Sequence, residues 1–371
     1  MGKVDYYGSY ASSGKPKNRK LGISLLFDAF FLILSIAVAG LFVCLLLSTF
    51  ISPEALGAFS AIGLYALYLY MAMTALVLYW IVRWRLINAS FMAVLLIVGL
   101  FFISPFYKLE ISKQHPQKFP RSFKLMSYNL RQMDIEQHRV GYDSLRSFLV
   151  RENPNIVVLQ EAFVVDSIDT LLMSRRFSRM PYTKKRRDTS MAIYSRYNFA
   201  KDHDHAVDSL PNIIWADIIA GDDTVRIFNI SLHLDNAEVD SLTGKPIYHE
   251  QNISQRMQSW SENSRQRVEQ ARSIQPYLKA CPYPYVVVGS INDIAFSYAY
   301  NLLSDGLQDA YVEKGFGFSY TYRGFEDMQR LDYALVSPKL EVLSYEVLEL
   351  VDMAEHYPLF VRFDYESNKK K

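Results

Sequence analysis

The chain has 371 residues, a formal net charge of +2 and a hydrophobic content of 50%. This length allows one large domain together with a second part, and a charge so close to zero provides no overall attraction to nucleic acid. The two cysteines, Cys44 and Cys281, lie far apart, which excludes a disulfide framework, and neither a metal-binding cysteine spacing nor a glycine-rich phosphate loop is present.

Three long uncharged runs lie near the N-terminus, at residues 29–51, 58–82 and 86–107. Each is close to the roughly 20 residues that a helix needs to cross a bilayer, and a buried globular helix rarely stays uncharged for so long. A cleaved signal peptide fits poorly, because three runs follow one another. The sequence therefore predicts three transmembrane helices within residues 22–107, after a basic segment at residues 1–21.

The basic residues around these runs predict an orientation in the membrane. Four of them lie between residues 15 and 20, and Arg83 and Arg85 separate the second run from the third, whereas the loop at 52–57 has only one charged residue, an acid. Cytoplasmic loops carry an excess of Lys and Arg, so the N-terminus and the Arg83–Arg85 turn are expected in the cytoplasm. Everything after residue 107 is then expected on the far side of the membrane.

From residue 121 the pattern changes to short apolar segments between polar turns. Many strands with interspersed helices predict an α+β sandwich of two sheets with helices outside, over residues 121–366. A linker is expected at 108–120 and a charged tail at 367–371. The expected strands are 123–130, 156–161, 191–194, 213–219, 225–234, 285–288, 333–336 and 359–363, and the expected helices are 143–152 and 264–278.

Polar residues stand at the ends of several of these strands. Taken singly, each has a simple structural explanation: an asparagine after a strand is usually a turn former, a glutamate can cap or face solvent, and a histidine can be partly buried with its hydrogen bonds satisfied. Asp332 is harder to dismiss, because an acid inside an apolar strand needs a partner to offset its desolvation. The residues are Asn129, Glu161, His233, Asn292, Asp332 and His356.

These residues lie in six short motifs. They are Ser127-Tyr128-Asn129-Leu130, Val158-Leu159-Gln160-Glu161, Ser231-Leu232-His233-Leu234, Gly289-Ser290-Ile291-Asn292-Asp293, Arg330-Leu331-Asp332-Tyr333 and Glu355-His356-Tyr357-Pro358. Their order resembles the endonuclease/exonuclease/phosphatase superfamily, which includes DNase I-like nucleases, inositol polyphosphate 5-phosphatases and sphingomyelinases. The resemblance covers residues 121–363 and implies a four-layer DNase I-like sandwich.

The three runs before such a domain also resemble membrane-anchored members from Bacteroidetes-type bacteria. That resemblance implies a multi-pass protein of the bacterial inner membrane, and the orientation expected from the basic residues puts the catalytic domain on the periplasmic side. It implies hydrolysis of a phosphate ester, which needs a divalent cation, an activated water and stabilisation of the leaving oxygen. Glu161 would be the principal ligand of Mg²⁺ or Mn²⁺, with Asn129 and Glu355 beside it, and Asn129 would also orient the phosphate.

The resemblance assigns roles to the remaining residues as well. Asp332 would fix the tautomer of His356 and raise its basicity. His233 would donate to a non-bridging phosphate oxygen, and Asn292 would hold the attacking water together with residue 290. Nucleic acid, phosphoinositide and phospholipid all remain possible substrates, because the same set of residues serves each.

Two departures from the family pattern fall inside the site. Ser290 stands where the family has the aspartate of Gly-Asp-x-Asn, and a serine hydroxyl cannot act as a base near neutral pH, so a loss of about 10²–10⁴-fold is expected. Glu355 stands where an aspartate usually precedes the histidine, and a displacement of about 1 Å can cost 10²-fold. Ser290 is not expected to be a nucleophile, since the Gly-x-Ser-x-Gly elbow is missing.

The departures leave two interpretations open. One is a membrane-anchored, metal-dependent phosphoesterase impaired by Ser290 and Glu355. The other is a non-catalytic phosphate-binding or scaffold protein that keeps the fold. The basic run at residues 184–187 would either form a solvated loop or meet phosphate groups, and it does not separate the two interpretations.

Overall fold

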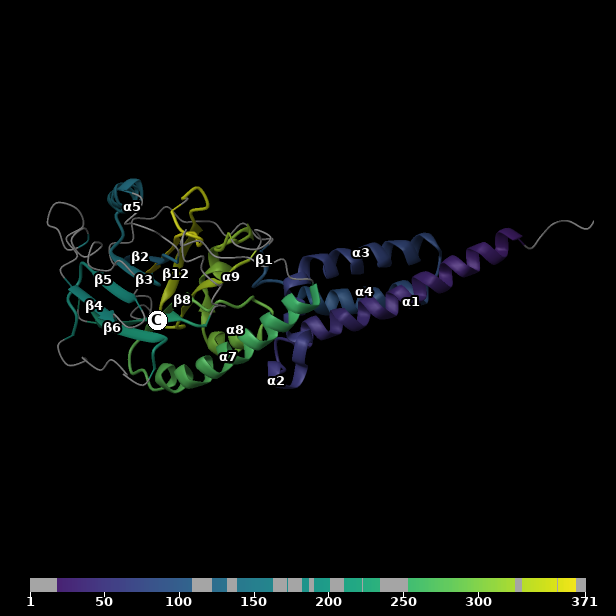
Figure 1. Cartoon of the computed structure of the whole chain (residues 1–371), viewed down its shortest axis with the longest axis horizontal. Helices are drawn as coiled ribbons and strands as arrows, with labels where there is room; N and C mark the ends of the chain where they lie inside the picture. Colours follow the sequence, from purple (N-terminus) through teal and green to yellow (C-terminus); the bar gives the residue numbers. More distant parts are fainter. Residues whose placement is uncertain are drawn as a thin grey trace, which may run out of the picture. The chain divides into compact units, whose positions relative to one another are not determined.

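The computed structural model, shown in Figure 1, divides into two compact units. One unit consists of Met1–Phe42 and Leu67–Leu96, and the other of Val43–Ala66 and Ile97–Lys371. The residues that the structure describes are 19–108, 122–131, 139–162, 172, 182–186, 190–200, 210–221, 223–233, 253–323, 329–351 and 353–364.

The apolar N-terminal region forms α1 (Arg19–Leu47), α3 (Ala66–Val82) and α4 (Leu86–Leu100). Two stretches, Ser24–Leu47 and Phe59–Val82, are long and apolar enough to cross a membrane. The third helix has 15 residues, fewer than the roughly 20 that a span needs. The prediction of three membrane-spanning helices is thus supported for two of them, because the third uncharged run leaves the helical conformation after Leu100.

Within the first unit, polar side chains pair with one another between helices. Asp28 Oδ1 accepts a hydrogen bond from Arg83 Nε at 2.8 Å, and Trp80 Nε1 donates to Ser35 Oγ at 2.8 Å. The large apolar side chains of α1 are in contrast exposed, as at Ile33, which is 70% exposed. An apolar exposed surface of this kind is what a surrounding lipid phase would cover.

The second unit contains the predicted α+β sandwich of two sheets. The parallel pairs are β2 with β3 and β7 with β8, and the other strand pairs are antiparallel. One sheet has the order β6 (Ile213–Ala220), β7 (Asp223–Ser231), β8 (Tyr285–Ser290), β11 (Asp332–Val336), β9 (Gln308–Asp309); the other has the order β12 (Glu341–Val347), β13 (Leu359–Asp364), β2 (Ser122–Asn129), β3 (Ile156–Gln160), β5 (Met191–Ser195), β4 (Tyr182–Arg186).

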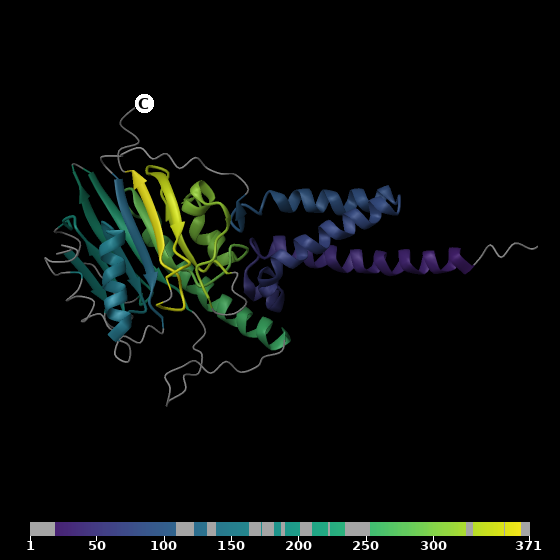
Figure 2. The same ribbon diagram turned by 90° about the horizontal axis from the view of Figure 1, so that it is seen from above.

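Helices cover the outer faces of both sheets, which gives four layers (Figure 1). On the six-stranded sheet, Leu145 and Phe148 of α5 (Arg139–Glu152) pack in one buried cluster with residues of β2 and β3, and Figure 2 shows α5 lying over the strands. On the five-stranded sheet, Val268 of α7 (Ile253–Lys279) packs with Val287 of β8. Burial of apolar side chains on both faces of each sheet explains the nearly continuous apolar strand sequences.

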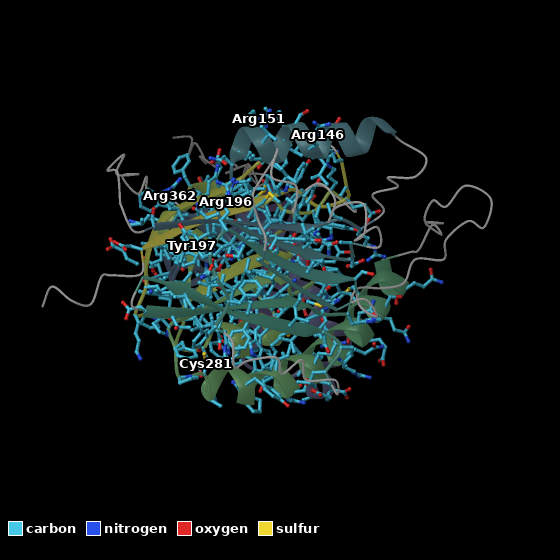
Figure 3. The ribbon with its side chains drawn as sticks, turned by 90° about the vertical axis from the view of Figure 1, so that its left-hand side faces the viewer. Arg146, Arg151, Arg196, Tyr197, Cys281 and Arg362 are labelled. Carbon is cyan, nitrogen blue, oxygen red and sulfur yellow. The ribbon has the colours of Figure 1, made fainter. Side chains whose placement is uncertain are left out.

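The outer side of α5 is basic and faces away from the sheet. Arg146 and Arg151 project from it in Figure 3, and Arg151 pairs with Glu152 at 2.9 Å. The side chain of Arg151 is 68% exposed, and a surface ion pair of this kind contributes little stability. The inner faces of the sheets instead form one apolar core, with Leu125 and Val288 among its members.

A buried polar contact joins the two sheets close to one end of the sandwich. Asn229 Nδ2 of β7 donates to Leu159 O of β3 at 2.8 Å, and Gln160 Nε2 donates to Asn229 Oδ1 at 2.8 Å. Gly289 lies beside this contact with φ of 132°, and a Cβ there would overlap the carbonyl oxygen of Ile230. Glycine is therefore required where the strand ends of the two sheets come together.

The segment Val43–Ala66 belongs to the same unit as the sandwich. It includes α2 (Pro53–Leu56) and the 3₁₀ helix η1 (Gly57–Tyr65). The hydroxyl of Ser60 donates to that of Ser261 on α7 at 3.1 Å. The N-terminal half of α7 thus packs on η1, which explains why α7 begins earlier than its apolar periodicity predicts.

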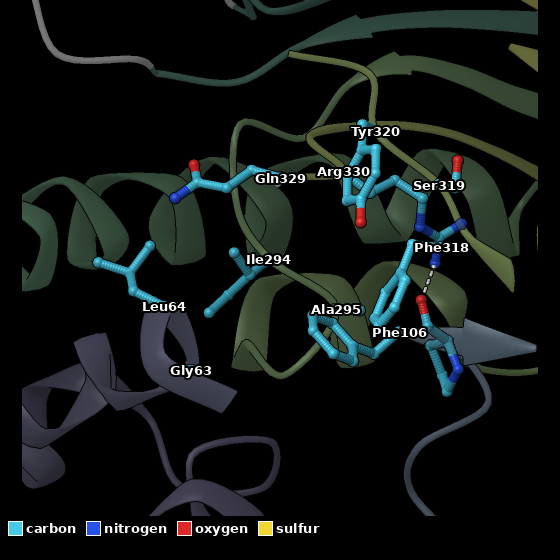
Figure 4. A pocket seen from close by; sticks show the side chains of 11 residues that line it. Gly63, Leu64, Phe106, Ile294, Ala295, Phe318, Ser319, Tyr320, Gln329 and Arg330 are labelled. Atoms are coloured by element: carbon cyan, nitrogen blue, oxygen red, sulfur yellow. Dashed lines mark hydrogen bonds between the residues drawn. The ribbon is translucent and has the colours of Figure 1, made fainter. Parts of the chain in front are cut away.

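Residues 97–108 also pack on the sandwich. The strand β1 (Tyr107–Lys108) pairs with β10 (Gly317–Phe318). The buried guanidinium of Arg330 donates to the carbonyl of Pro105 at 2.7 Å, a bond that Figure 4 shows beside a small cavity. Pro105 is therefore bonded to a residue that lies two positions before Asp332 in the sequence.

These contacts bear on the predicted domain boundary at residue 121. A fragment that begins there would lack the packing of both segments, and its independent folding stays a prediction. Residues 1–18, most of the predicted linker (109–120 of 108–120) and the predicted tail (367–371) lie outside the described residues. So does Arg187 of the basic run, whose preceding residues form the edge strand β4.

Candidate functional site

The predicted site residues gather at one edge of the sandwich. Asn129 is the last residue of β2, Glu161 follows β3, Ser290 ends β8 and Asp332 begins β11. The register pairs Asp332 directly with Ser290, so the start of one strand lies beside the end of its antiparallel neighbour. Residues up to 203 positions apart in the sequence thereby share one edge.

A continuous chain of hydrogen bonds links Glu161 to His356. Asn129 Nδ2 donates to Glu161 Oε1 at 2.9 Å and to Ser290 Oγ at 3.0 Å. Ser290 Oγ donates to Asp332 Oδ1 at 2.5 Å, and Asp332 Oδ2 lies 2.7 Å from His356 Nδ1. All of these residues except Glu161 are buried. Buried networks with satisfied members hold their side chains in one orientation.

The carboxylate of Asp332 therefore has partners on both oxygens. The backbone N–H of Asp332 and that of Leu331 each donate to Thr321 Oγ1 at 2.9 Å. These two bonds hold the start of β11 in place. Because Asp332 faces Nδ1 of His356, the single proton of a neutral ring is held on Nδ1, and Nε2 then carries no proton. The ring of Tyr322 lies 4.8 Å from the imidazole and covers it.

Two buried polar atoms of the site have no hydrogen-bond partner within the part of the chain that the structure describes, His356 Nε2 and Asn292 Oδ1. The amide of Asn292 donates to Leu232 O at 2.6 Å, and its backbone has φ of 56°, in the left-handed region. Glu161 has φ of 49° as well. Strained backbone and unpaired buried polar atoms concentrate at sites that bind a ligand.

His233 lies two residues after the end of β7 and directly follows Leu232, whose carbonyl accepts from Asn292. Its backbone N–H donates to Gln270 Oε1 at 2.7 Å, and its carbonyl accepts from Arg267 at 3.4 Å. The structure places it at the rim of the edge, and its predicted contact with phosphate stays a prediction.

The neighbouring acid, Asp293, does not replace the missing aspartate at position 290. Arg267 Nε donates to Asp293 Oδ2 at 3.0 Å, and Ser264 Oγ donates to the same oxygen at 3.1 Å. Both ion-pair side chains are buried, at 0% and 1% exposure. Asp293 thus holds α7 against the loop after β8.

Arg131 is a site residue that the sequence analysis missed. Its Nε lies 3.6 Å from Glu355 Oε2 and 4.0 Å from Glu161 Oε2. Its backbone N–H donates to Asn129 Oδ1 at 2.9 Å. Its position, two residues after Asn129 at the end of the same strand, could have indicated a place in the site. An arginine at such a position is, however, usually an ordinary surface residue.

The donor set fits a divalent cation held chiefly by Glu161. Among the described residues, no group of three or more His, Cys, Asp or Glu side chains could hold a metal ion. Mg²⁺ nevertheless binds through one or two carboxylates, completed by water and substrate phosphate, and Glu161 and Glu355 keep side-chain exposures of 21% and 16%. Asn129 turns its amide N–H toward Glu161, so here it orients that carboxylate.

Comparison with known sequences and solved structures shows which proteins the chain is similar to. Residues 126–353 match the Endonuclease/Exonuclease/phosphatase family. No curated protein sequence matches the chain. Humanized D. rerio TDP2 is similar in fold, at 14% identity and a TM-score of 0.50 over 66% of this chain and 99% of that one.

Two proteins of Bacteroides thetaiotaomicron are also among the similar solved structures. An endonuclease/exonuclease/phosphatase family protein has 17% identity and a TM-score of 0.47, over 66% of this chain and 96% of its own. A mannosyl-6-phosphatase has 18% identity and a TM-score of 0.44, over 65% of this chain and 99% of its own.

Proposed function

Because the chain belongs to the endonuclease/exonuclease/phosphatase family, we propose that it hydrolyses phosphate esters with the help of a divalent cation. Members of this family are generally phosphoester hydrolases that use divalent metal ions. The proposal rests chiefly on the buried chain of hydrogen bonds that runs from Glu161 to His356.

Each side chain of the site has a chemical role in this proposal. Glu161, with Glu355 beside it, would hold Mg²⁺ or Mn²⁺, and the bound cation would screen the charge of the phosphate. Asp332 would orient His356, whose Nε2, when the ring carries a proton on both nitrogens, would donate to a non-bridging phosphate oxygen. Asn292 would hold the attacking water through its unpaired Oδ1.

The same geometry explains why the activity would be low. The Ser290 hydroxyl is fully buried and donates to Asp332, so it does not accept a proton from a water. Removal of general-base help lowers rates by about 10²–10⁴-fold. A phosphate-binding protein without catalysis is therefore the second candidate function, favoured by the satisfied hydrogen bonds of Ser290.

We further propose that the chain is anchored in the inner membrane of a bacterium. Its support is the pair of long apolar helices, Ser24–Leu47 and Phe59–Val82, with their exposed apolar side chains. With a third crossing by α4, the positive-inside bias would place the sandwich in the periplasm. Reporter fusions after residue 108 would test this: alkaline phosphatase active there, and green fluorescent protein dark, is the expected pair of results.

A turnover panel on the purified full chain in detergent tests the proposed reaction. Substrates are bis-p-nitrophenyl phosphate, DNA, RNA and phospholipid vesicles, each with Mn²⁺, with Mg²⁺ and with chelator. Turnover that needs the cation and disappears in His356→Ala, but persists in Arg151→Gln on the outer face of α5, supports the enzyme. Tight binding of inorganic phosphate without turnover of any substrate, in the parent and in Ser290→Asp, supports the binding protein instead.

A further inference from the structure

The guanidinium of Arg131 lies against the two carboxylates that are proposed to receive the cation. It is 3.6 Å from Glu355 Oε2 and 4.0 Å from Glu161 Oε2, and its side chain is 14% exposed. The backbone of Arg131 is held too, since its N–H donates to Asn129 Oδ1 and its carbonyl accepts from the N–H of Glu355 at 3.4 Å. Arg131 is thus built into the site through both its backbone and its side chain.

A positive charge in this position opposes the binding of another cation. Arginine stays protonated at any pH at which the protein is folded, so it cannot relieve the repulsion by losing a proton. A divalent cation on Glu161 would stand within a few ångströms of the guanidinium, where repulsion is large at a site only partly exposed. The guanidinium therefore has to move before Glu161 can be fully occupied.

The site offers a destination for the displaced side chain. Guanidinium groups bind phosphate through two parallel hydrogen bonds, as they bind carboxylates. A phosphate ester held by His356 would lie at the same edge of the sandwich as Arg131. If the guanidinium of Arg131 exchanges its carboxylate partners for the phosphate, it stays paired with a negatively charged group at each stage.

We propose that Arg131 is the resident counter-charge of the site: it pairs with Glu161 and Glu355 until a divalent cation binds, and it then pairs with the phosphate of the substrate. This inference rests on the proposed function and adds a residue that regulates cation entry. Arg131 thus weakens cation binding in the free protein and strengthens phosphate binding.

The opposite signs of these two effects distinguish the proposal from a purely structural role. Calorimetry on the full chain in detergent would measure the dissociation constants of Mg²⁺ and of inorganic phosphate separately. In Arg131→Gln, we expect Mg²⁺ to bind at least about tenfold more tightly, since a repulsion of this size remains even at the dielectric constant of bulk water, and phosphate to bind about tenfold more weakly. Weakening of both, or no change in Mg²⁺ affinity, would overturn the proposal.

A nearby arginine provides the matched control. Arg323 donates its backbone N–H to Glu355 O, and its guanidinium donates to Val351 O at 2.7 Å and lies 4.5 Å from the ring of Tyr357. Arg323→Gln removes the same charge from the same neighbourhood, and should change the Mg²⁺ affinity by less than twofold. An equal gain in both variants would mean that general charge, and not the position of Arg131, sets the affinity.

A second variant keeps the test decisive if Arg131→Gln does not fold. Arg131→Lys retains a charge, but an ammonium cannot span both carboxylates as a guanidinium does. A smaller tightening of Mg²⁺ binding, in the same direction, is then expected, and an unchanged or weaker affinity overturns the inference. If the parent hydrolyses bis-p-nitrophenyl phosphate whatever these affinities are, the proposed function survives and only the role of Arg131 fails.

Discussion

Replacement of Ser290 with aspartate tests the mechanism and the hydrogen-bond chain together. Ser290 is fully buried, and its hydroxyl donates to Asp332 Oδ1 while it accepts from Asn129. An aspartate would still accept from Asn129, but it would remove the donor to Asp332 and place two carboxylates side by side. We therefore expect a gain in activity together with a loss of stability.

Both effects have a magnitude. A hydrogen bond to a charged group contributes about 1.5–3 kcal/mol, and two like charges about 4 Å apart repel by about 4 kcal/mol at the effective dielectric of a protein site. The bond from Asn129 becomes a stronger one to a charged acceptor and offsets part of this loss, so the net loss from Ser290→Asp should be about 4 kcal/mol. For a domain of this size, that corresponds to a fall in Tm of roughly 10 °C. A recovered general base should raise the rate by about 10²-fold.

The measurements are thermal unfolding and steady-state kinetics of the full chain, each with and without Mn²⁺. Ser290→Asn is the matched control, since it has nearly the size of aspartate but no charge. Mn²⁺ should restore part of the lost Tm in Ser290→Asp and none in Ser290→Asn. If Ser290→Asp folds and yet turns over bis-p-nitrophenyl phosphate no faster than the parent, position 290 does not limit the reaction and the binding-protein interpretation is preferred.

Further predictions follow from single side chains. Glu161→Ala should abolish Mg²⁺ binding in calorimetry, and an unchanged affinity would remove Glu161 from the cation site. Asn229→Ala should cost about 2–4 kcal/mol in denaturant unfolding, because two backbone carbonyls and a glutamine lose a buried partner. Burial alone would raise the pKa of Glu152, but hydrogen bonds from Arg151 and Lys124 outweigh it and hold that pKa below its usual value. Since a depressed pKa stabilises above the unfolded value, Glu152→Gln should cost less than about 1 kcal/mol at pH 7, and this difference should vanish as the pH falls through the folded pKa.

The sandwich could be predicted from the sequence because its strands are short apolar runs between turns. The run at 285–288 became β8, and 213–219 became β6, each within two residues of its predicted end. β12 (Glu341–Val347) was not predicted, since it mixes exposed acids with apolar residues and acquires its conformation by pairing with β13. The N-terminal half of α7 was also missed, because its sequence is polar and its stability comes from packing on η1 rather than from apolar periodicity.

The candidate site could be located but not fully described from the sequence. Asn129, Glu161 and Asp332 were found because each is a polar residue beside or within a short apolar strand and lies in a motif that resembles those of the family. The hydrogen bonds of Ser290 depend on the antiparallel register of β8 and β11, which the sequence leaves open. Arg131 was not predicted, because only its distances to the carboxylates of Glu161 and Glu355 distinguish it from a solvent-exposed arginine.

Ser290 and Arg131 act on one charge balance, and their combination is the sharpest prediction. In the parent, the carboxylates of Glu161 and Glu355 face the guanidinium of Arg131. Ser290→Asp adds a carboxylate, which draws Arg131 more strongly to the site and so masks part of the gain in cation affinity. Removal of Arg131 from that variant should therefore tighten Mg²⁺ binding by more than its removal from the parent, a coupling that single variants do not reveal. Calorimetry on Ser290→Asp, Arg131→Gln and the double variant measures it. If the two gains simply multiply, Arg131 does not shield position 290, and the two residues influence the cation independently.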